Sequence, residues 1–168
     1  MNLIKKITLV CFLAIAAIAC SNDDDNGSSK KNEFTYDGTS YELSLGYLED
    51  FGEFSEGVYN FDIYLLSSNA ENGMYFEMFT DNQNKLEVGT YTLSNSGNAN
   101  TFSSSSEIGI NLNSENEKYY EITEGTVEIL SNDTYKIEFE GTANGKAFSG
   151  YYKGSLNSGD ILPRPARK

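Results

Sequence analysis

The stretch TVEILSNDTYKIEFEGTANGKAFSGYY, residues 126–152, decides the fold. Apolar and polar side chains alternate through it, and a period of two predicts half-buried β-strands. The alternating runs are 126–130, 135–140 and 146–152, and turn-forming clusters separate them at 131–133 and 143–145. Connections this short join antiparallel neighbours, so the sequence predicts a C-terminal meander.

Similar alternation precedes this stretch. Further strands are expected at 34–36, 39–43, 61–65, 74–79, 86–93 and 108–112. Asp37-Gly38 lies between the first two and is a strong hairpin signal. No segment shows a helical stripe. About eight to ten short strands, each with one apolar face, must pack face to face or close on themselves, so we expect an all-β domain, either an antiparallel β-sandwich or a flattened β-barrel.

Two stretches interrupt the alternation. Residues 46–57, GYLEDFGEFSEG, are expected to form a long acidic and aromatic connection. Residues 94–106 are rich in Ser and Asn and are expected to be a mobile connection. At the other end of the body, residues 158–168, SGDILPRPARK, are basic and contain both prolines of the chain, which predicts a disordered tail.

The N-terminal residues have the pattern of a signal peptide. Lys5 and Lys6 precede an apolar run, 7–19, which is well short of the roughly 20 residues that span a bilayer. The run ends in AIAC, which resembles a lipobox, so we expect a lipoprotein signal peptide and a lipid on Cys20. Two or three acyl chains would hold the protein firmly on a membrane. The alternative is an ordinary leader in which Cys20 has no role.

Residues 20–32 are expected to be a lipidated, acidic and flexible tether, because they contain no apolar residue beyond the Cys. The acids at 23–25 resemble the surface-export signal of lipoproteins in the Bacteroidota, which implies an outer-membrane lipoprotein exposed on the cell surface. A plain tether on a lipoprotein that faces the periplasm is the alternative. The expected organisation is a signal peptide at 1–19, a tether at 20–32, an all-β domain at 33–157 and a basic tail at 158–168.

Four stretches carry a wider resemblance: FTYDG at 34–38, GTYT at 89–92, GTVEI at 125–129 and KAFSGYYKG at 146–154. Together they resemble uncharacterised all-β lipoproteins of the Bacteroidota. The resemblance implies an exported β-sandwich or barrel and no particular activity. The lipid on Cys20 is the one residue role that it carries over.

Composition excludes several kinds of chemistry. The net charge of −13 repels phosphate backbones and anionic headgroups, so we expect no nucleic-acid partner. The chain has no His, and Cys20 is the one Cys outside the leader, which leaves neither imidazole nor disulfide chemistry. Residues 81–87 are the best calcium-loop candidate, but Lys85 and Leu86 stand where a ligand and a Gly are needed. We therefore expect no metal and no cofactor.

Acid-pair hydrolysis of a glycoside or of peptidoglycan is a second alternative. Acidic residues crowd two segments, at positions 49, 50, 53 and 56 and at positions 115, 117 and 121. An acidic chain clusters carboxylates in solvated loops without any catalytic role, so we expect no catalytic residue and no enzyme.

Aromatic residues in and around 46–57 favour ligand binding. Tyr47, Phe51, Phe54 and Tyr59 lie near carboxylates and amides, and exposed rings stack on sugars or pack on a protein. The alternative is that these rings fold back over the core. We therefore expect a non-enzymatic binding module for a glycan or a protein, which requires Phe51 or Phe54 to be exposed. A structural component of an outer-membrane complex is the first alternative function.

Overall fold

The computed structural model describes residues 30–158, and eleven β-strands account for all of the regular structure in that range. No helix among these residues is long and apolar enough to cross a membrane. The expected signal peptide, Cys20, most of the tether and the tail beyond Ser158 lie outside the described residues.

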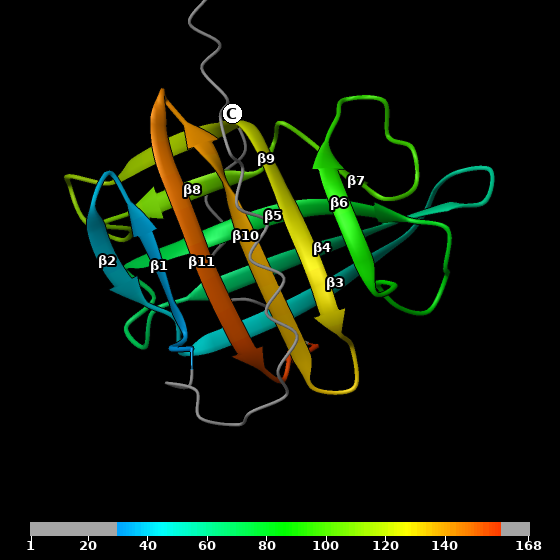
Figure 1. Cartoon of the computed structure of the whole chain (residues 1–168), viewed down its shortest axis with the longest axis horizontal. Coiled ribbons are helices and arrows are strands. Elements are labelled where there is room, and N and C mark those ends of the chain that lie inside the picture. Colours follow the sequence, from blue (N-terminus) through cyan, green and yellow to red (C-terminus); the bar gives the residue numbers. More distant parts are fainter. Residues whose placement is uncertain (1–29, 159–168) are drawn as a thin grey trace, which may run out of the picture.

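Six strands lie side by side in the front layer of Figure 1. In spatial order they are β2 (Thr39–Glu42), β1 (Glu33–Tyr36), β11 (Lys146–Gly154), β10 (Tyr135–Ala143), β9 (Lys118–Ser131) and β6 (Gly89–Leu93). Three further strands run behind them and crosswise in this view: β3 (Leu45–Ser55), β4 (Val58–Leu66) and β5 (Asn72–Thr80).

Two short strands join the layers. β8 (Glu107–Ile110) pairs with both β5 and β9, and β7 (Thr101–Phe102) pairs with both β5 and β6. Because β6 also pairs with β9, the strands β5, β8, β9, β6 and β7 form a closed five-strand barrel, to which the outer strands are added. Closure removes the free edges of these five strands.

The core lies between the two layers and is made by the inward positions of the alternating strands. Phe61, Ile63 and Leu65 of β4 are buried in it, as the period of two requires. The rings of Phe76 on β5 and Phe139 on β10 are 5.3 Å apart and connect the two layers. The core therefore includes residues from both halves of the chain.

Several expectations from the sequence are confirmed. The chain is all-β, and β9, β10 and β11 pair consecutively as an antiparallel meander. Asp37 and Gly38 join β1 to β2 with positive φ angles of 47° and 79°, as a two-residue hairpin of type I′ requires. These features depend on short-range patterns, which explains why the sequence predicts them.

The expected connection at 46–57 is wrong, because these residues form most of β3, which pairs along its length with β4. The alternation was hidden by an outer face that is aromatic and acidic and by register shifts between Asp50 and Gly52 and between Glu53 and Ser55. A β-bulge adds a residue and breaks the period of two.

The expected mobile connection at 94–106 is also wrong for its second half. Thr101 and Phe102 form β7, and the side chain of Phe102 is fully buried. Ser103 and Ser106 are buried as well, and the hydroxyl of Ser106 accepts a hydrogen bond of 3.1 Å from the N–H of Glu77 on β5. Ser103 and Ser106 thus form hydrogen bonds with the backbone of β5. The structure has more strands than expected because β3 and β7 were not predicted.

Candidate functional site

The outer surface of β3, β4 and β5 carries rings and carboxylates. Since the inward positions of these strands enter the core, the alternate positions face outward. We call this surface the aromatic–acidic face, and its residues are Tyr47, Glu49, Phe51, Phe54, Asp62, Tyr64, Tyr75, Glu77 and Phe79. The three strands contain no Lys or Arg. The face therefore combines ring surface with charge of a single sign.

A row of tyrosines crosses this face. Tyr47 on β3 lies opposite Tyr64 on β4, and Tyr64 lies opposite Tyr75 on β5. The ring centroids of Tyr64 and Tyr75 are 4.9 Å apart, and their planes are inclined by 36°. Cross-strand aromatic pairs of this kind contribute about 0.2–1 kcal/mol. The neighbouring rings thus hold one another in place.

A row of carboxylates lies beside the tyrosines. Glu49 lies opposite Asp62, and Asp62 lies opposite Glu77. The side chain of Asp62 is fully buried, with hydrogen bonds from the hydroxyl of Tyr75 at 2.7 Å and from the Nδ2 of Asn60 at 3.2 Å. A buried carboxylate requires such donors, so the acidic row fixes the orientation of Tyr75.

The two phenylalanines of β3 are among the most exposed large apolar residues described. Phe51, which lies at the bulge, is 45% exposed and Phe54 is 58% exposed. The ring of Phe54 lies 4.8 Å from that of Phe79, and a Cβ added to Gly97 would come within 2.5 Å of its Cε1 atom. The ring of Phe54 thus packs against Phe79 and lies close to Gly97, while the rest of its surface is exposed to solvent. Both rings have the exposure expected of ligand-binding residues, and their role stays a prediction.

The structure separates the other two predicted residues. Tyr47 is half-buried and lies on the aromatic–acidic face, in the same layer as Phe51 and Phe54. Tyr59 is half-buried too, but it packs against the core on the inner side of β4. Three of the four predicted aromatic residues therefore share one surface.

The negative charge continues across the neighbouring strands. Tyr75 lies opposite Glu107 on β8, and Glu107 lies opposite Glu121 on β9. The pKa of Tyr119 on β9 is raised above its usual value, first by partial burial and then by the negative charges of Glu117 and Glu107. The field around the face thus extends beyond the three strands that define it.

A second candidate site lies on the outer surface of the front layer. It is a shallow groove of about 590 Å³ over β9, β10, β11 and β1. Its floor is the cross-strand pair Gly125 and Gly141, where the two backbones approach so closely that a Cβ on Gly141 would overlap the carbonyl oxygen of Glu124. We call it the glycine-floored groove. The backbones of β9 and β10 are therefore in close contact beneath the groove.

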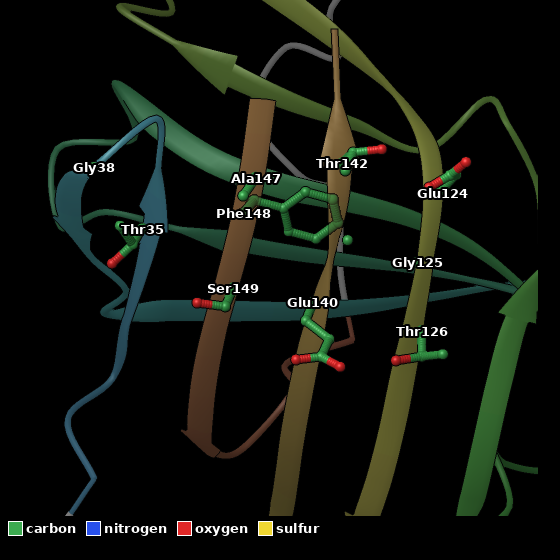
Figure 2. Close-up of a pocket in the computed structure, with 11 residues that line it drawn as sticks. Thr35, Gly38, Glu124, Gly125, Thr126, Glu140, Thr142, Ala147, Phe148 and Ser149 are labelled. Atoms are coloured by element: carbon green, nitrogen blue, oxygen red, sulfur yellow. The ribbon is translucent and has the colours of Figure 1, made fainter. Parts of the chain in front are cut away.

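Hydroxyls and carboxylates border the glycine-floored groove. Figure 2 shows Glu140 and Thr126 on one side of the floor and Thr142 and Glu124 on the other. Ser149 continues the first side onto β11. This groove offers hydrogen-bonding groups and little exposed ring surface, in contrast with the aromatic–acidic face.

Two of the acids considered for hydrolysis stabilise the local backbone of β3. The carboxylate of Asp50 accepts a hydrogen bond of 2.7 Å from the N–H of Gly52, and that of Glu53 accepts one of 3.1 Å from the N–H of Gly57. Among residues 30–158, no group of three or more His, Cys, Asp or Glu side chains is placed to hold a metal ion.

No protein-family model matches this chain, and neither a curated protein nor a solved structure shows significant similarity to it. The assignment of a site therefore rests on the residues themselves.

Tyr64, Tyr75 and Asp62 were not singled out from the sequence. Their place on the outer side of β4 and β5 follows from alternation with the apolar positions, and this signal was available. Their alignment with Tyr47 and Glu49 follows from the register between strands, which no local pattern specifies.

Proposed function

We propose that this chain is a lipoprotein, anchored through Cys20 and exposed on the cell surface, whose all-β domain is a non-enzymatic binding module. The proposed ligand is a glycan that lies on the aromatic–acidic face, and a protein ligand is the alternative. The exposure of Phe51 and Phe54 beside a fixed row of tyrosines carries this proposal.

The chemistry of the face suits a sugar. Burial of apolar surface contributes about 25 cal/mol per Å², and the C–H face of a sugar ring offers such surface to an aromatic side chain. Carboxylates such as Glu49 accept hydrogen bonds from sugar hydroxyls and fix their orientation. Because β3, β4 and β5 carry acids and no Lys or Arg, a neutral or amino-containing glycan fits better than an anionic one.

The contacts of the first described residues support the same face. The side chain of Asn32 accepts from the N–H of Lys153 at 2.8 Å, and Lys30 forms an ion pair of 2.5 Å with Glu138. These contacts hold Lys30 and Asn32 against the outer surface of the front layer. The aromatic–acidic face lies on the opposite layer from these contacts (Figure 1).

We also propose the flattened barrel as the better description of the fold. The closed barrel of β5, β8, β9, β6 and β7 supports it over two separate packed sheets.

A glycan array tests the binding proposal. The full mature chain is used with Cys20→Ser, which removes the lipid. We expect binding that falls at least tenfold, about 1.4 kcal/mol, in Phe51→Ser and Phe54→Ser. Leu130→Ser is the matched control, because Leu130 is 40% exposed on β9 in the other layer. Equal binding by all three variants would contradict the site, and no binding by the parent would favour a structural role.

The anchor is tested separately by membrane fractionation of cells that express Cys20→Ala. We expect this variant to escape lipid-dependent processing and to leave the membrane fraction, because one residue carries all the acyl chains. A variant that stays membrane-bound and is processed like the parent would overturn the anchor.

A further inference from the structure

We infer that residues 159–168 of this chain dock across the aromatic–acidic face, where they compete with a ligand of that face. The docking goes beyond the proposed function; the competition with a ligand rests on it. The inference differs from the sequence analysis, which expects a disordered tail at 158–168.

The last described residues reach the edge of this face. The N–H of Asn157 donates to the carbonyl of Gly46 at 2.9 Å, and the N–H of Leu48 donates to the carbonyl of Asn157 at 3.0 Å. Asn157 thus forms a parallel bridge with Tyr47 of β3. Leu156 packs against the core beside it. At Asn157 the chain therefore lies beside β3, the strand that borders the face, and runs parallel to it.

The segment is long enough to cover the face. Ten residues extend over about 33 Å. The step from β3 across β4 to β5 is two strand spacings, about 10 Å. Even a bent path from Asn157 reaches the far side of β5.

The segment and the aromatic–acidic face carry opposite charges. It contains Arg164, Arg167 and Lys168 against a single acid, Asp160. β3, β4 and β5 carry acids and no Lys or Arg, whereas the front layer intersperses its acids with lysines of β9, β10 and β11. The basic segment therefore meets charge of one sign on the aromatic–acidic face and mixed charge elsewhere.

The carboxylate row adds a specific reason. Glu49, Asp62 and Glu77 lie opposite one another on adjacent strands, so the row concentrates negative charge along one line of the face. An Arg guanidinium pairs with carboxylates through its planar edge and stacks on rings through its face. This face places a row of carboxylates directly beside a row of tyrosines.

The apolar part of the segment fits the phenylalanines. Ile161 and Leu162 precede the sequence Pro163-Arg164-Pro165. Prolines hold a chain extended, and extended proline-containing segments dock on aromatic surfaces. Phe51 and Phe54 supply such a surface further along β3, in the direction in which the chain runs at Asn157.

The docking is expected to be reversible. Each exposed ion pair contributes about 0–1 kcal/mol, so the segment releases readily. The covalent connection nevertheless keeps it at a high effective concentration near the face. If it covers the face about nine-tenths of the time, its removal raises the apparent affinity for a ligand about tenfold.

A spin label tests the docking. Ala166→Cys is introduced into the full mature chain with Cys20→Ser, so that the label has a single site. We expect paramagnetic broadening of the amide signals of Tyr64 and Tyr75 that is clearly stronger than any broadening at Ser149 and Glu140 in the front layer, because packed sheets lie about 10 Å apart. Salt at about 1 M shortens the screening length to about 3 Å and should remove the broadening.

Charge reversal provides the matched variants. Arg164→Glu, Arg167→Glu and Lys168→Glu together should abolish the broadening. Lys136→Glu, Lys146→Glu and Lys153→Glu, which make the same change of charge on the front layer, should leave it intact. Absence of broadening in the parent, or stronger broadening in the front layer than at Tyr64 and Tyr75, would overturn the docking. Labelled chain mixed with isotope-enriched, unlabelled chain must give no broadening, because transfer between molecules would assign the contact to a second copy.

The competition between residues 159–168 and a glycan is measured separately. Reversal of the segment's three basic residues should raise the affinity for an array-identified glycan about tenfold. An unchanged affinity would overturn the competition. A parent chain that shows broadening but binds no glycan would contradict the proposed function and leave the docking established.

Discussion

The two layers use tyrosine in opposite ways. In the front layer, Tyr36, Tyr91 and Tyr152 point into the core and are almost fully buried. Each buried hydroxyl donates to a main-chain carbonyl, at 3.2 Å, 3.0 Å and 2.9 Å respectively. The bodies of these side chains fill the interior, and the hydroxyls satisfy backbone groups at its rim.

In the back layer, Tyr47, Tyr64 and Tyr75 point outward and form a row on the surface. The hydroxyl of Tyr75 donates to the carboxylate of Asp62 rather than to the backbone. The comparison teaches that the phase of the alternation, and not the residue type, decides whether a tyrosine packs into the core or lies on the outer face.

The largest test of this contrast compares Tyr91→Ala with Tyr64→Ala. Tyr91 is fully buried, so its truncation should lower the free energy of unfolding by about 3–5 kcal/mol. Truncation of Tyr64 removes its ring contact with Tyr75 and its pairing with Tyr47, and should cost about 1 kcal/mol. Urea denaturation followed by circular dichroism measures both. Similar losses in the two variants would mean that the outward row is part of the folding core.

A second test concerns the backbone under the glycine-floored groove. Gly141→Val places a side chain against the carbonyl of Glu124, and the strained contact should lower the free energy of unfolding by about 1–3 kcal/mol. Ser149→Ala, on the same exposed surface, should stay within about 0.5 kcal/mol of the parent. Urea denaturation again gives both values. If Gly141→Val left the free energy of unfolding unchanged, β9 and β10 would have to separate freely at this point.

The smallest expected effect is a pH dependence of the free energy of unfolding that is caused by the inward tyrosines. Burial raises the pKa of Tyr36, Tyr91 and Tyr152 above that of a free tyrosine. An unfolded tyrosine loses its proton near pH 10, while the folded protein keeps it. The free energy of unfolding should therefore be unaffected by these groups below that pH and should fall as the pH rises above it.

The variant Tyr91→Phe isolates this contribution, because it keeps the ring and removes the titrating hydroxyl. Urea denaturation at pH 8 and at alkaline pH should show a smaller loss of stability in the variant than in the parent. An equal loss in both proteins would assign the alkaline dependence to other groups.

Most strands of the domain were predictable because their alternation is regular. The meander at 126–152 and the hairpin at Asp37-Gly38 are examples, since each depends on neighbours in sequence. β3 was missed because two register shifts and an acidic, aromatic outer face obscure its period. β7 was missed because its two residues are too short to show a period at all.

The candidate site was predictable in part. The concentration of rings and acids at 46–57 pointed to Tyr47, Phe51 and Phe54, and these share one face. Tyr59 has the same composition around it but lies one position out of phase, on the core side of β4. Tyr64, Tyr75 and Asp62 complete the face only through pairing with strands that are distant from one another in sequence.

By itself, the sequence determined the all-β class, the short antiparallel connections and the sidedness of each regular strand, because the direction of a side chain alternates with every residue of a strand. The tertiary structure alone decided that β5, β8, β9, β6 and β7 close into a barrel, that Gly125 meets Gly141, and that the carboxylates and tyrosines of β3, β4 and β5 align in rows. These features depend on which strands pair and in which register. Register is set by the packing of the whole core, so no local stretch of the chain encodes it.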